Sequence, residues 1–316
     1  MRILALALLV FSSMASADEQ LRRDALALFG RLPAPPPMSA EAELGRALYW
    51  DERVSLDGKT SCASCHFARD WGADRRRFSP DARGALTSRH SPTIFNSMGQ
   101  PALRWLSDRK NGADQAEGSL TGSLGFPSKE AALEKLRALY PNQAQPMTTA
   151  RYGQAVAAYQ ATLVTPAPFD RFLGGDDSAL SDAQKAGLRT FMSTGCAGCH
   201  NGVLLGGTSL QKFGLLKDYW TETGSPKPDV GRFAVTKKEE DRYVFRVPML
   251  RNVAKTAPYF HDGSVDDLGR AVRVMASVQL GRTLDDATVS SIVAFLTSLS
   301  GEVPANYAPP GRRPEL

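Results

Sequence analysis

Histidine and cysteine are both scarce in this chain, with four residues of each among 316. An excess of charge of one sign is also missing, because 38 basic residues stand against 33 acidic ones and leave a formal net charge of +5. A chain so close to neutral gives no reason to expect a nucleic-acid partner. Hydrophobic residues make up 42% of the sequence, which is enough for globular cores.

Long apolar runs are absent after the first 17 residues. A membrane-spanning helix needs roughly 18 continuous apolar residues, so we expect no membrane span. Residues 1–17 begin with Met1 and Arg2, continue through an apolar run and end in small residues, which is the pattern of a cleaved secretory signal. The sequence therefore predicts a signal peptide over 1–17 and a periplasmic mature protein. Its 37 basic and 33 acidic residues (38 − 1 and 33) leave a charge of +4.

All four cysteines lie in two CxxC motifs, and a histidine directly follows each motif. Four cysteines in an exported chain would ordinarily predict two disulfides, and CxxC pairs also occur as zinc ligands and as thioredoxin-like redox motifs. None of these needs the histidine, and chance would place one behind both motifs with odds of roughly (4/316)², about 1 in 6,000.

Covalent haem attachment does need that histidine, because the two thiols bind the porphyrin while the imidazole binds the iron. We therefore predict two covalently bound haem c groups. The first is held by Cys62, Cys65 and His66, and the second by Cys196, Cys199 and His200.

A predicted helix precedes each motif, so the chain looks like a duplication. Ser39 begins the first helix, which has an acidic first turn where the helix dipole favours carboxylates. The second begins with the capping box Ser181-x-x-Gln184, and Gly195 is its expected C-cap. A helix followed by CxxCH is how a class I cytochrome c domain begins.

The stretch 163–182 is rich in Pro, Gly and Asp and predicts a domain boundary near Ser178. We therefore expect an N-terminal domain over 18–178 and a C-terminal domain over 179–316. The proline-rich residues 31–38 predict an extended arm that packs little.

The second half is expected to be rich in loops from residue 206 to about 264. Apolar spacing then predicts two closing helices, one through 268–275 and one through 289–299. Strand signals are scarce throughout. The predicted fold class is mainly α, with two class I cytochrome c-like haem domains in tandem and long loops.

A six-coordinate haem needs a second axial ligand, usually methionine or histidine. Met275 lies on the apolar stripe of a predicted helix, where methionine serves as core filler as readily as a ligand. The two remaining histidines, His90 and His261, could each be a haem ligand, a propionate partner or a capped polar residue. Spacing alone leaves these alternatives open.

Several segments resemble the bacterial di-haem cytochrome c peroxidases, the family that also includes the MauG-type enzymes. The similarity runs from about Leu44 to Gly301 and is strongest in the second half. The segments that carry it are NGVLLGG, DVGRFAVTKKEEDRYVFRVPMLRNVAKTAPYFHDGSV, AVRVMASVQLG, SPTIFN and ATLVTPAPFDRFLGGD.

The resemblance implies an oxidoreductase that reduces hydrogen peroxide to water with electrons from a small periplasmic cytochrome c or cupredoxin. The N-terminal domain would be the peroxidatic one, and the C-terminal domain would take up electrons. Met275 would be the axial ligand of the second haem. Trp105 would relay electrons between the haems, an ordinary core tryptophan being the alternative. The family leaves a homodimer open.

The resemblance also implies a calcium ion near Thr256 and Pro258, whose positions match carbonyl ligands in the family. The family's asparagine ligand is His90 in this chain, and histidine is a poor calcium ligand. His261 matches a histidine that lies near a haem propionate.

The peroxide side departs from the family pattern. Residues 67–89 contain no histidine, and the ungapped register puts Ala82 where the family has its distal histidine. We therefore expect the first haem to be five-coordinate or water-bound, and open to peroxide without reductive activation. The same register puts Thr121 and Gly125 where the family has a distal glutamine and a distal glutamate.

The missing acid–base group leaves only weak candidates. Asp114 and Glu117 are candidates for proton transfer, and the run Arg75–Arg77 for charge stabilisation.

Two other functions stay open. A MauG-like oxidase would use peroxide to oxidise tyrosine or tryptophan on a partner protein, but that pattern has tyrosine as the second axial ligand, so Met275 counts against it. A plain di-haem electron carrier would keep both haems six-coordinate, so the vacant position expected at the first haem counts against that function.

Overall fold

The computed structural model describes residues 17–314 of the chain. The predicted signal peptide falls outside these residues except for Ala17 and stays a prediction. None of the helices in this range combines the length and the apolar character that crossing a membrane takes.

The α-helices are α1 (Ala17–Phe29), α2 (Ala40–Trp50), α3 (Gly112–Thr121), α4 (Lys129–Leu139), α5 (Thr149–Ala161), α6 (Pro168–Gly174), α7 (Asp182–Thr194), α8 (Tyr219–Thr223), α9 (Phe233–Thr236), α10 (Leu268–Leu280) and α11 (Asp286–Thr297).

The sheet consists of two three-residue strands, β1 (Leu210–Lys212) and β2 (Val244–Arg246), which pair antiparallel. The mainly helical class is therefore confirmed. Loops and short helical turns make up most of residues 206–264, and residues 31–38 form an extended, largely exposed arm, both as expected. The predicted helices at 268–275 and 289–299 are α10 and α11.

Both helices that precede the CxxCH motifs begin where their caps predict. The Ser39 hydroxyl accepts a hydrogen bond from the Ala42 amide at 3.1 Å, which satisfies one of the free donors at the start of α2. Ser181 and Gln184 form the reciprocal capping box of α7. Gly195 ends α7 with φ of 102°, a conformation that glycine adopts without the steric penalty of a Cβ.

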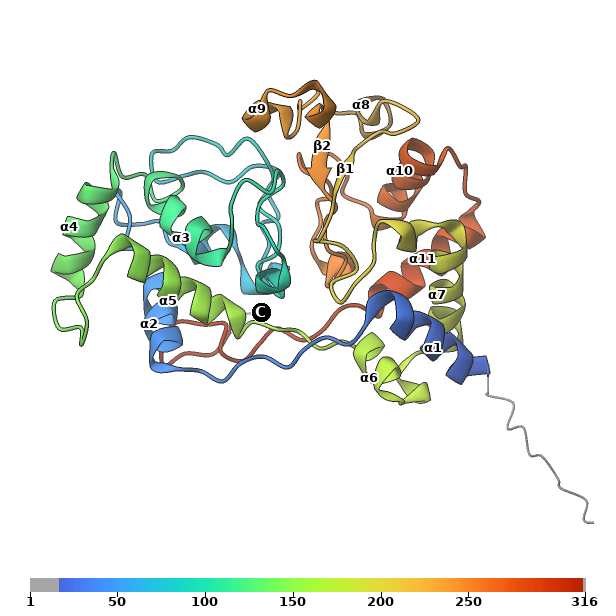
Figure 1. Cartoon of the computed structure of the whole chain (residues 1–316), viewed down its shortest axis with the longest axis horizontal. Helices are drawn as coiled ribbons and strands as arrows, with labels where there is room; N and C mark the ends of the chain where they lie inside the picture. The colour runs from blue at the N-terminus through green and yellow to red at the C-terminus, as the bar shows by residue number, and fades with distance from the viewer. Residues whose placement is uncertain (1–16, 315–316) are drawn as a thin grey trace, which may run out of the picture.

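Each half of the molecule is built around one crossed helix pair, α2 with α5 and α7 with α11 (Figure 1). A glycine sits at each crossing. A Cβ on Gly45 would overlap the backbone carbonyl of Ala155, and a Cβ on Gly187 would overlap that of Ser291. The two helices of each pair therefore approach backbone to backbone.

The two halves also correspond in a pair of turns that both contact Thr165. Asn96 and Asn252 both adopt left-handed backbone conformations, with φ of 61° and 64°, and both directly precede a short helical turn. Their side-chain amides donate to the same Thr165 hydroxyl, at 2.7 and 2.9 Å. Two equivalent turns, one from each half, are thus tied to one buried residue, as a duplicated chain would allow.

The two ends of the chain pack with the opposite halves. The core of the first half includes Tyr49 and Tyr159 but also Tyr307 from the C-terminal segment. The core of the second half includes Phe191 and Phe295 but also Phe29 from α1. Figure 1 shows α1 beside α7, and the C-terminal segment running back past α2 and α5. The division into 18–178 and 179–316 stays a prediction, because both terminal segments cross it.

The Pro, Gly and Asp-rich stretch taken as a boundary contains a helix, α6. Proline is tolerated in the first helical turn, and Asp170 caps that turn by accepting from the Ala167 amide at 2.8 Å. Phe169 and Phe172 bury themselves in the second core. The Asp170 carboxylate also forms a two-pronged ion pair, at 2.8 and 2.9 Å, with the buried guanidinium of Arg251. The composition of this stretch therefore did not reveal that it contains a packed helix.

We predict that Gly45→Ala destabilises the protein by about 1–3 kcal/mol, because the added methyl forces α2 away from α5. Scanning calorimetry of the holoprotein would measure this as a fall in Tm. Gly174→Ala is the control, because the nearest atom to its new methyl is an Arg31 nitrogen at 3.9 Å. It should leave Tm unchanged or raise it, since alanine is the better helix former. Equal falls in both variants would contradict the close crossing.

Candidate di-haem site

One cavity of about 610 Å³ is lined by residues of both CxxCH motifs. It runs between the two halves of the molecule and is bounded by α3 and α5 on one side and by α10 and α11 on the other. Met275 and Trp105 also line it. The structure thus brings together every residue predicted to bind the two haems or to connect them.

The first motif folds as a short helical turn over Cys62–Cys65, and His66 follows it. The Nδ1 atom of His66 lies 2.9 Å from the carbonyl oxygen of Gly72. A carbonyl can only accept, so Nδ1 carries the proton and Nε2 keeps its lone pair. Burial lowers the pKa of His66, which also favours the neutral ring.

The second motif repeats this arrangement. Its helical turn starts at Cys196, directly after the left-handed Gly195. His200 is buried, its Nδ1 donates to the carbonyl of Leu205 at 3.1 Å, and burial lowers its pKa. Each imidazole is therefore held as the tautomer whose Nε2 is free to bind a metal, with a backbone carbonyl fixing the ring, which is the usual arrangement of a histidine ligand.

The thiols fit haem attachment better than the alternatives. All four cysteines are unpaired, so neither motif is a disulfide. Burial raises the pKa of Cys62 to about 12 and of Cys196 to about 11, whereas thioredoxin-like cysteines need a lowered pKa. Among residues 17–314, no group of three or more His, Cys, Asp or Glu is arranged to hold a metal ion.

Met275 lies on α10 and faces the cavity while packing against the cluster that contains Trp105, Phe213 and Tyr219. The thioether therefore has both an apolar environment and access to the second site. Its role as axial ligand stays a prediction.

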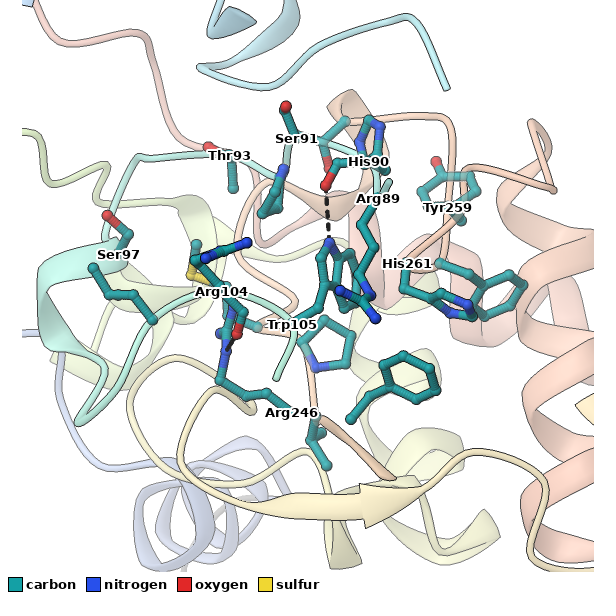
Figure 2. A pocket seen from close by; sticks show the side chains of 18 of the residues that line it. Arg89, His90, Ser91, Thr93, Ser97, Arg104, Trp105, Arg246, Tyr259 and His261 are labelled. Carbon is teal, nitrogen blue, oxygen red and sulfur yellow. Dashed lines mark hydrogen bonds between the residues drawn. The ribbon is translucent and has the colours of Figure 1, made fainter. Parts of the chain in front are cut away.

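Trp105 lines the cavity and is buried (Figure 2). Its indole Nε1 donates to the carbonyl of His90 at 2.9 Å, drawn as the dashed line in Figure 2. Its ring stands edge-on to His261, with centroids 6.3 Å apart. The side chain is thus fixed in orientation by one hydrogen bond and one ring contact.

His90, Thr256 and Pro258 all line the same cavity. The His90 carbonyl already accepts from Trp105, and its Nδ1 lies 3.2 Å from the carbonyl of Arg76. Calcium prefers carboxylate and carbonyl oxygens, and the imidazole supplies neither. Calcium therefore stays a prediction with little support from this donor set, and no step of the function depends on it.

His261 is buried among aromatic rings. Its imidazole stacks on Phe245 with centroids 4.2 Å apart and an interplanar angle of 23°. Burial lowers the pKa of His261 to about 4, although the Asp229 carboxylate lies 3.9 Å from Nε2. Asp229 is already engaged by Arg89 through two hydrogen bonds of 2.7 and 2.8 Å, so it offers His261 little compensation.

The ungapped register matched three positions to the family's distal residues. None of these positions, Ala82, Thr121 and Gly125, lines the cavity. A Cβ on Gly125 would lie 3.1 Å from that of Ala82, so these two positions are neighbours. The register itself stays a prediction.

The candidate acids and bases are engaged elsewhere. Asp114 accepts from the Lys110 amide, and Glu117 binds Lys129 and Thr149. The arginines of the run 75–77 pair with Asp70, Asp74 and Asp262, outside the cavity lining.

Gln115 is the cavity residue that the sequence did not reveal. It lies on α3, lines the cavity, and its buried Oε1 has no hydrogen-bond partner in the described chain. Ser119 lines the cavity from the same helix, and Gly122 lines it from the C-cap of that helix. The signal was the i, i+4 spacing of Gln115 and Ser119, which places both on one helical face. An amide in this position can orient a small polar ligand but cannot act as an acid or base.

Comparisons with known proteins show which proteins this chain is similar to. A family model described as di-haem cytochrome c peroxidase matches residues 39–178. The chain is 40% identical to a cytochrome c551 peroxidase of Pseudomonas aeruginosa, over 94% of this chain and 91% of that protein. It is 28% identical to the methylamine utilization protein MauG of Methylophilus methylotrophus, over 85% and 86%. A solved MauG-like protein associated with microbial copper homeostasis aligns with a TM-score of 0.74 and 26% identity, over 89% and 97%.

We predict that replacing Cys62 and Cys65 together by serine leaves one haem covalently attached per chain instead of two. Mass spectrometry of the denatured protein measures the attached haem directly. The matched variant is the Cys196 and Cys199 pair, which should lose the other haem and leave a different absorption spectrum. Two attached haems in either variant would exclude these cysteines as the attachment sites.

We predict that His261 makes the stability of the fold depend on pH. The unfolded chain takes up a proton near pH 6.5, whereas the folded chain resists it down to about pH 4. Stability from this residue is complete above about pH 6.5 and is lost as the pH falls toward 4, by on the order of 3 kcal/mol.

Urea unfolding of the wild type and of His261→Phe at pH 7 and pH 4.5 measures this difference. In His261→Phe, the free energy of unfolding should fall much less between pH 7 and pH 4.5 than it does in the wild type. Phe169→Leu is the control, because Phe169 is buried in the core of the second half and its ring contacts are Phe29 and Phe295, so the surroundings of His261 are kept and the decline should match that of the wild type. An unchanged decline in His261→Phe would exclude His261 as the cause.

Proposed function

The chain belongs to the di-haem cytochrome c peroxidase family, and from this premise we propose that it reduces hydrogen peroxide to water in the periplasm with electrons from a small cytochrome c or cupredoxin. The observation that carries the proposal is the pair of histidines, each with Nε2 left free by an Nδ1 bond to a carbonyl, on one shared cavity. The segment that precedes residue 18 supplies the argument for export.

Two haem c groups, when bound, supply one-electron redox chemistry at both sites and a metal that can accept peroxide at the first. Cys62, Cys65 and His66 would hold the first group. Cys196, Cys199, His200 and Met275 would hold the second. A methionine ligand raises the reduction potential relative to a second histidine, so we assign electron entry to the C-terminal half and peroxide reduction to the N-terminal half.

Trp105 is the side chain that we propose to carry electrons between the sites. Its support is its place in the wall of the shared cavity and its fixed orientation. A buried aromatic ring that does not move between redox states keeps the path length constant. The hydrogen bond to the His90 carbonyl holds the ring without adding charge to it.

The peroxide side of the first site would work with fewer groups than acid–base catalysis usually employs. No histidine lies between residues 67 and 89 to occupy the open position, so peroxide would have access without a prior reduction step. Gln115 can hydrogen-bond peroxide and orient it. The two carboxylates that line the cavity, Asp81 and Asp108, are paired with Arg83 and Arg104, so proton transfer would depend on water in the cavity, and we expect this to limit the rate.

The test is turnover by the holoprotein, as isolated in the oxidised state, with peroxide and a pre-reduced small cytochrome c. We predict oxidation of the donor without pre-reduction of the enzyme. Trp105→Phe should slow donor oxidation at least about tenfold, roughly 1.4 kcal/mol of activation free energy, while both haems remain bound. Trp220→Phe is the control, because Trp220 packs beside Tyr219 but does not line the cavity.

Two outcomes would replace the proposal. If the donor stayed reduced while peroxide led to oxidised tyrosine or tryptophan on a partner protein, the chain would be a MauG-like oxidase. If peroxide caused no reaction although electrons passed through both haems, the chain would be an electron carrier.

A further inference from the structure

Arg246 is a buried cation without an anion. Of the four arginines that line the cavity in the described part of the chain, Arg89 pairs with Asp229, Arg104 with Asp108 and Arg109 with Asp114. Arg246, the last residue of β2, is 6% exposed and forms no ion pair with any residue in 17–314. Figure 2 shows it in the cavity wall below Trp105.

The guanidinium of Arg246 is only partly satisfied. Its Nε donates to the carbonyl of Arg104 at 2.9 Å, and this is the one side-chain hydrogen bond it makes within residues 17–314. The two terminal nitrogens are left for the cavity. Burial lowers the pKa of Arg246 to about 10, so the group is still charged at neutral pH. A buried charge without a partner is strongly unfavourable, and a guanidinium with two free nitrogens matches a carboxylate in shape.

The position of β2 indicates which site this charge serves. The chain continues from the end of β2 to Pro248, and a Cβ on Gly206 would touch both the Pro248 carbonyl and Nδ1 of His200. The segment after Arg246 therefore passes directly beside the second histidine. Phe245, Val247 and Pro248 line the cavity along the same segment.

We propose that Arg246 binds a propionate carboxylate of the haem held at Cys196, Cys199 and His200, and that its charge raises the reduction potential of that haem. This rests on the proposed function, because it assigns the carboxylate to a bound haem. Ferric haem carries one more positive charge than ferrous haem, so a nearby fixed cation disfavours the oxidised state. Removing the cation lowers the potential.

The same residue also fixes the electron path. The Arg246 amide donates to the carbonyl of Trp105 at 2.7 Å, next to the Nε bond to the Arg104 carbonyl. One residue thus holds both the haem carboxylate and the backbone of the tryptophan between the sites. Arg246 is a positioning residue, and its charge must be separated from this structural role in any test.

The experiment is a potentiometric titration of both haems in the full-length holoprotein, with Arg246→Met and Arg246→Lys. In the methionine variant, the reduction potential of the second haem should fall by about 59 mV. For a one-electron couple this raises the ratio of oxidised to reduced haem about tenfold at a fixed potential. The lysine variant keeps the charge and should stay near the wild-type value. Arg232→Met is the control, because Arg232 donates to the Leu106 carbonyl at 2.7 Å but does not line the cavity.

Equal shifts with methionine and lysine, or no shift with either, would overturn the proposal, as would a shift confined to the first haem. If the methionine variant fails to fold, resonance Raman spectra of the wild type and the lysine variant decide. In the wild type, the propionate bending band should have the frequency of a hydrogen-bonded carboxylate. In the lysine variant, the frequency of this band should change. A band at the position of a free carboxylate would overturn the proposal. Haem content and peroxide turnover of the wild type, measured in parallel, show separately whether the proposed function holds.

Discussion

The orientation of two imidazoles is the constraint on which the rest of the structure depends. Each ring is held by a hydrogen bond from Nδ1 to a backbone carbonyl, that of Gly72 for His66 and that of Leu205 for His200. Both bonds depend on tight turns that bring a carbonyl back to the ring five or six residues after the histidine. Left-handed residues make those turns, Gly72 with φ of 73° and Leu205 with φ of 51°. Loops rich in such residues are therefore the framework of the site, and the crossed helices behind them supply its rigidity.

A duplicated chain brings two such sites to one cavity only if its halves are tied together. Thr165 does this by accepting from Asn96 and Asn252, the equivalent residues of the two halves. The C-terminal segment adds a second tie, because Tyr307 donates its hydroxyl to the carbonyl of His66. The distance between the sites is thus fixed by buried polar contacts and does not rest on loop packing alone. A short, constant path between redox centres requires such rigidity.

Local signals were enough to predict the helices before each motif, because a cap and its helix lie within a few residues of each other. The helix caps formed by Ser39, Ser181 and Gly195 agree with the predicted ones. Composition was a poorer guide at α6, where Pro168 and Asp170 favour a helix start as well as a loop. The CxxCH motifs predicted which residues would hold the haem groups, and all six of these residues line one cavity. Arg246 could not be recognised from the sequence, since its lack of a partner exists only after β2, Arg104 and the cavity are assembled.

The two halves share a framework but differ in what faces the histidine-lined cavity. The second half offers Met275 on α10, an apolar thioether suited to a permanent ligand. The first half offers Gln115 on α3, an amide with an unsatisfied buried oxygen, which suits a small polar ligand that binds reversibly. An unsatisfied buried oxygen is unfavourable, so a small hydrogen-bonding ligand beside Gln115 would stabilise that face of the cavity. This difference between a thioether and an amide supports the roles proposed for the two halves, which duplication alone would leave equivalent.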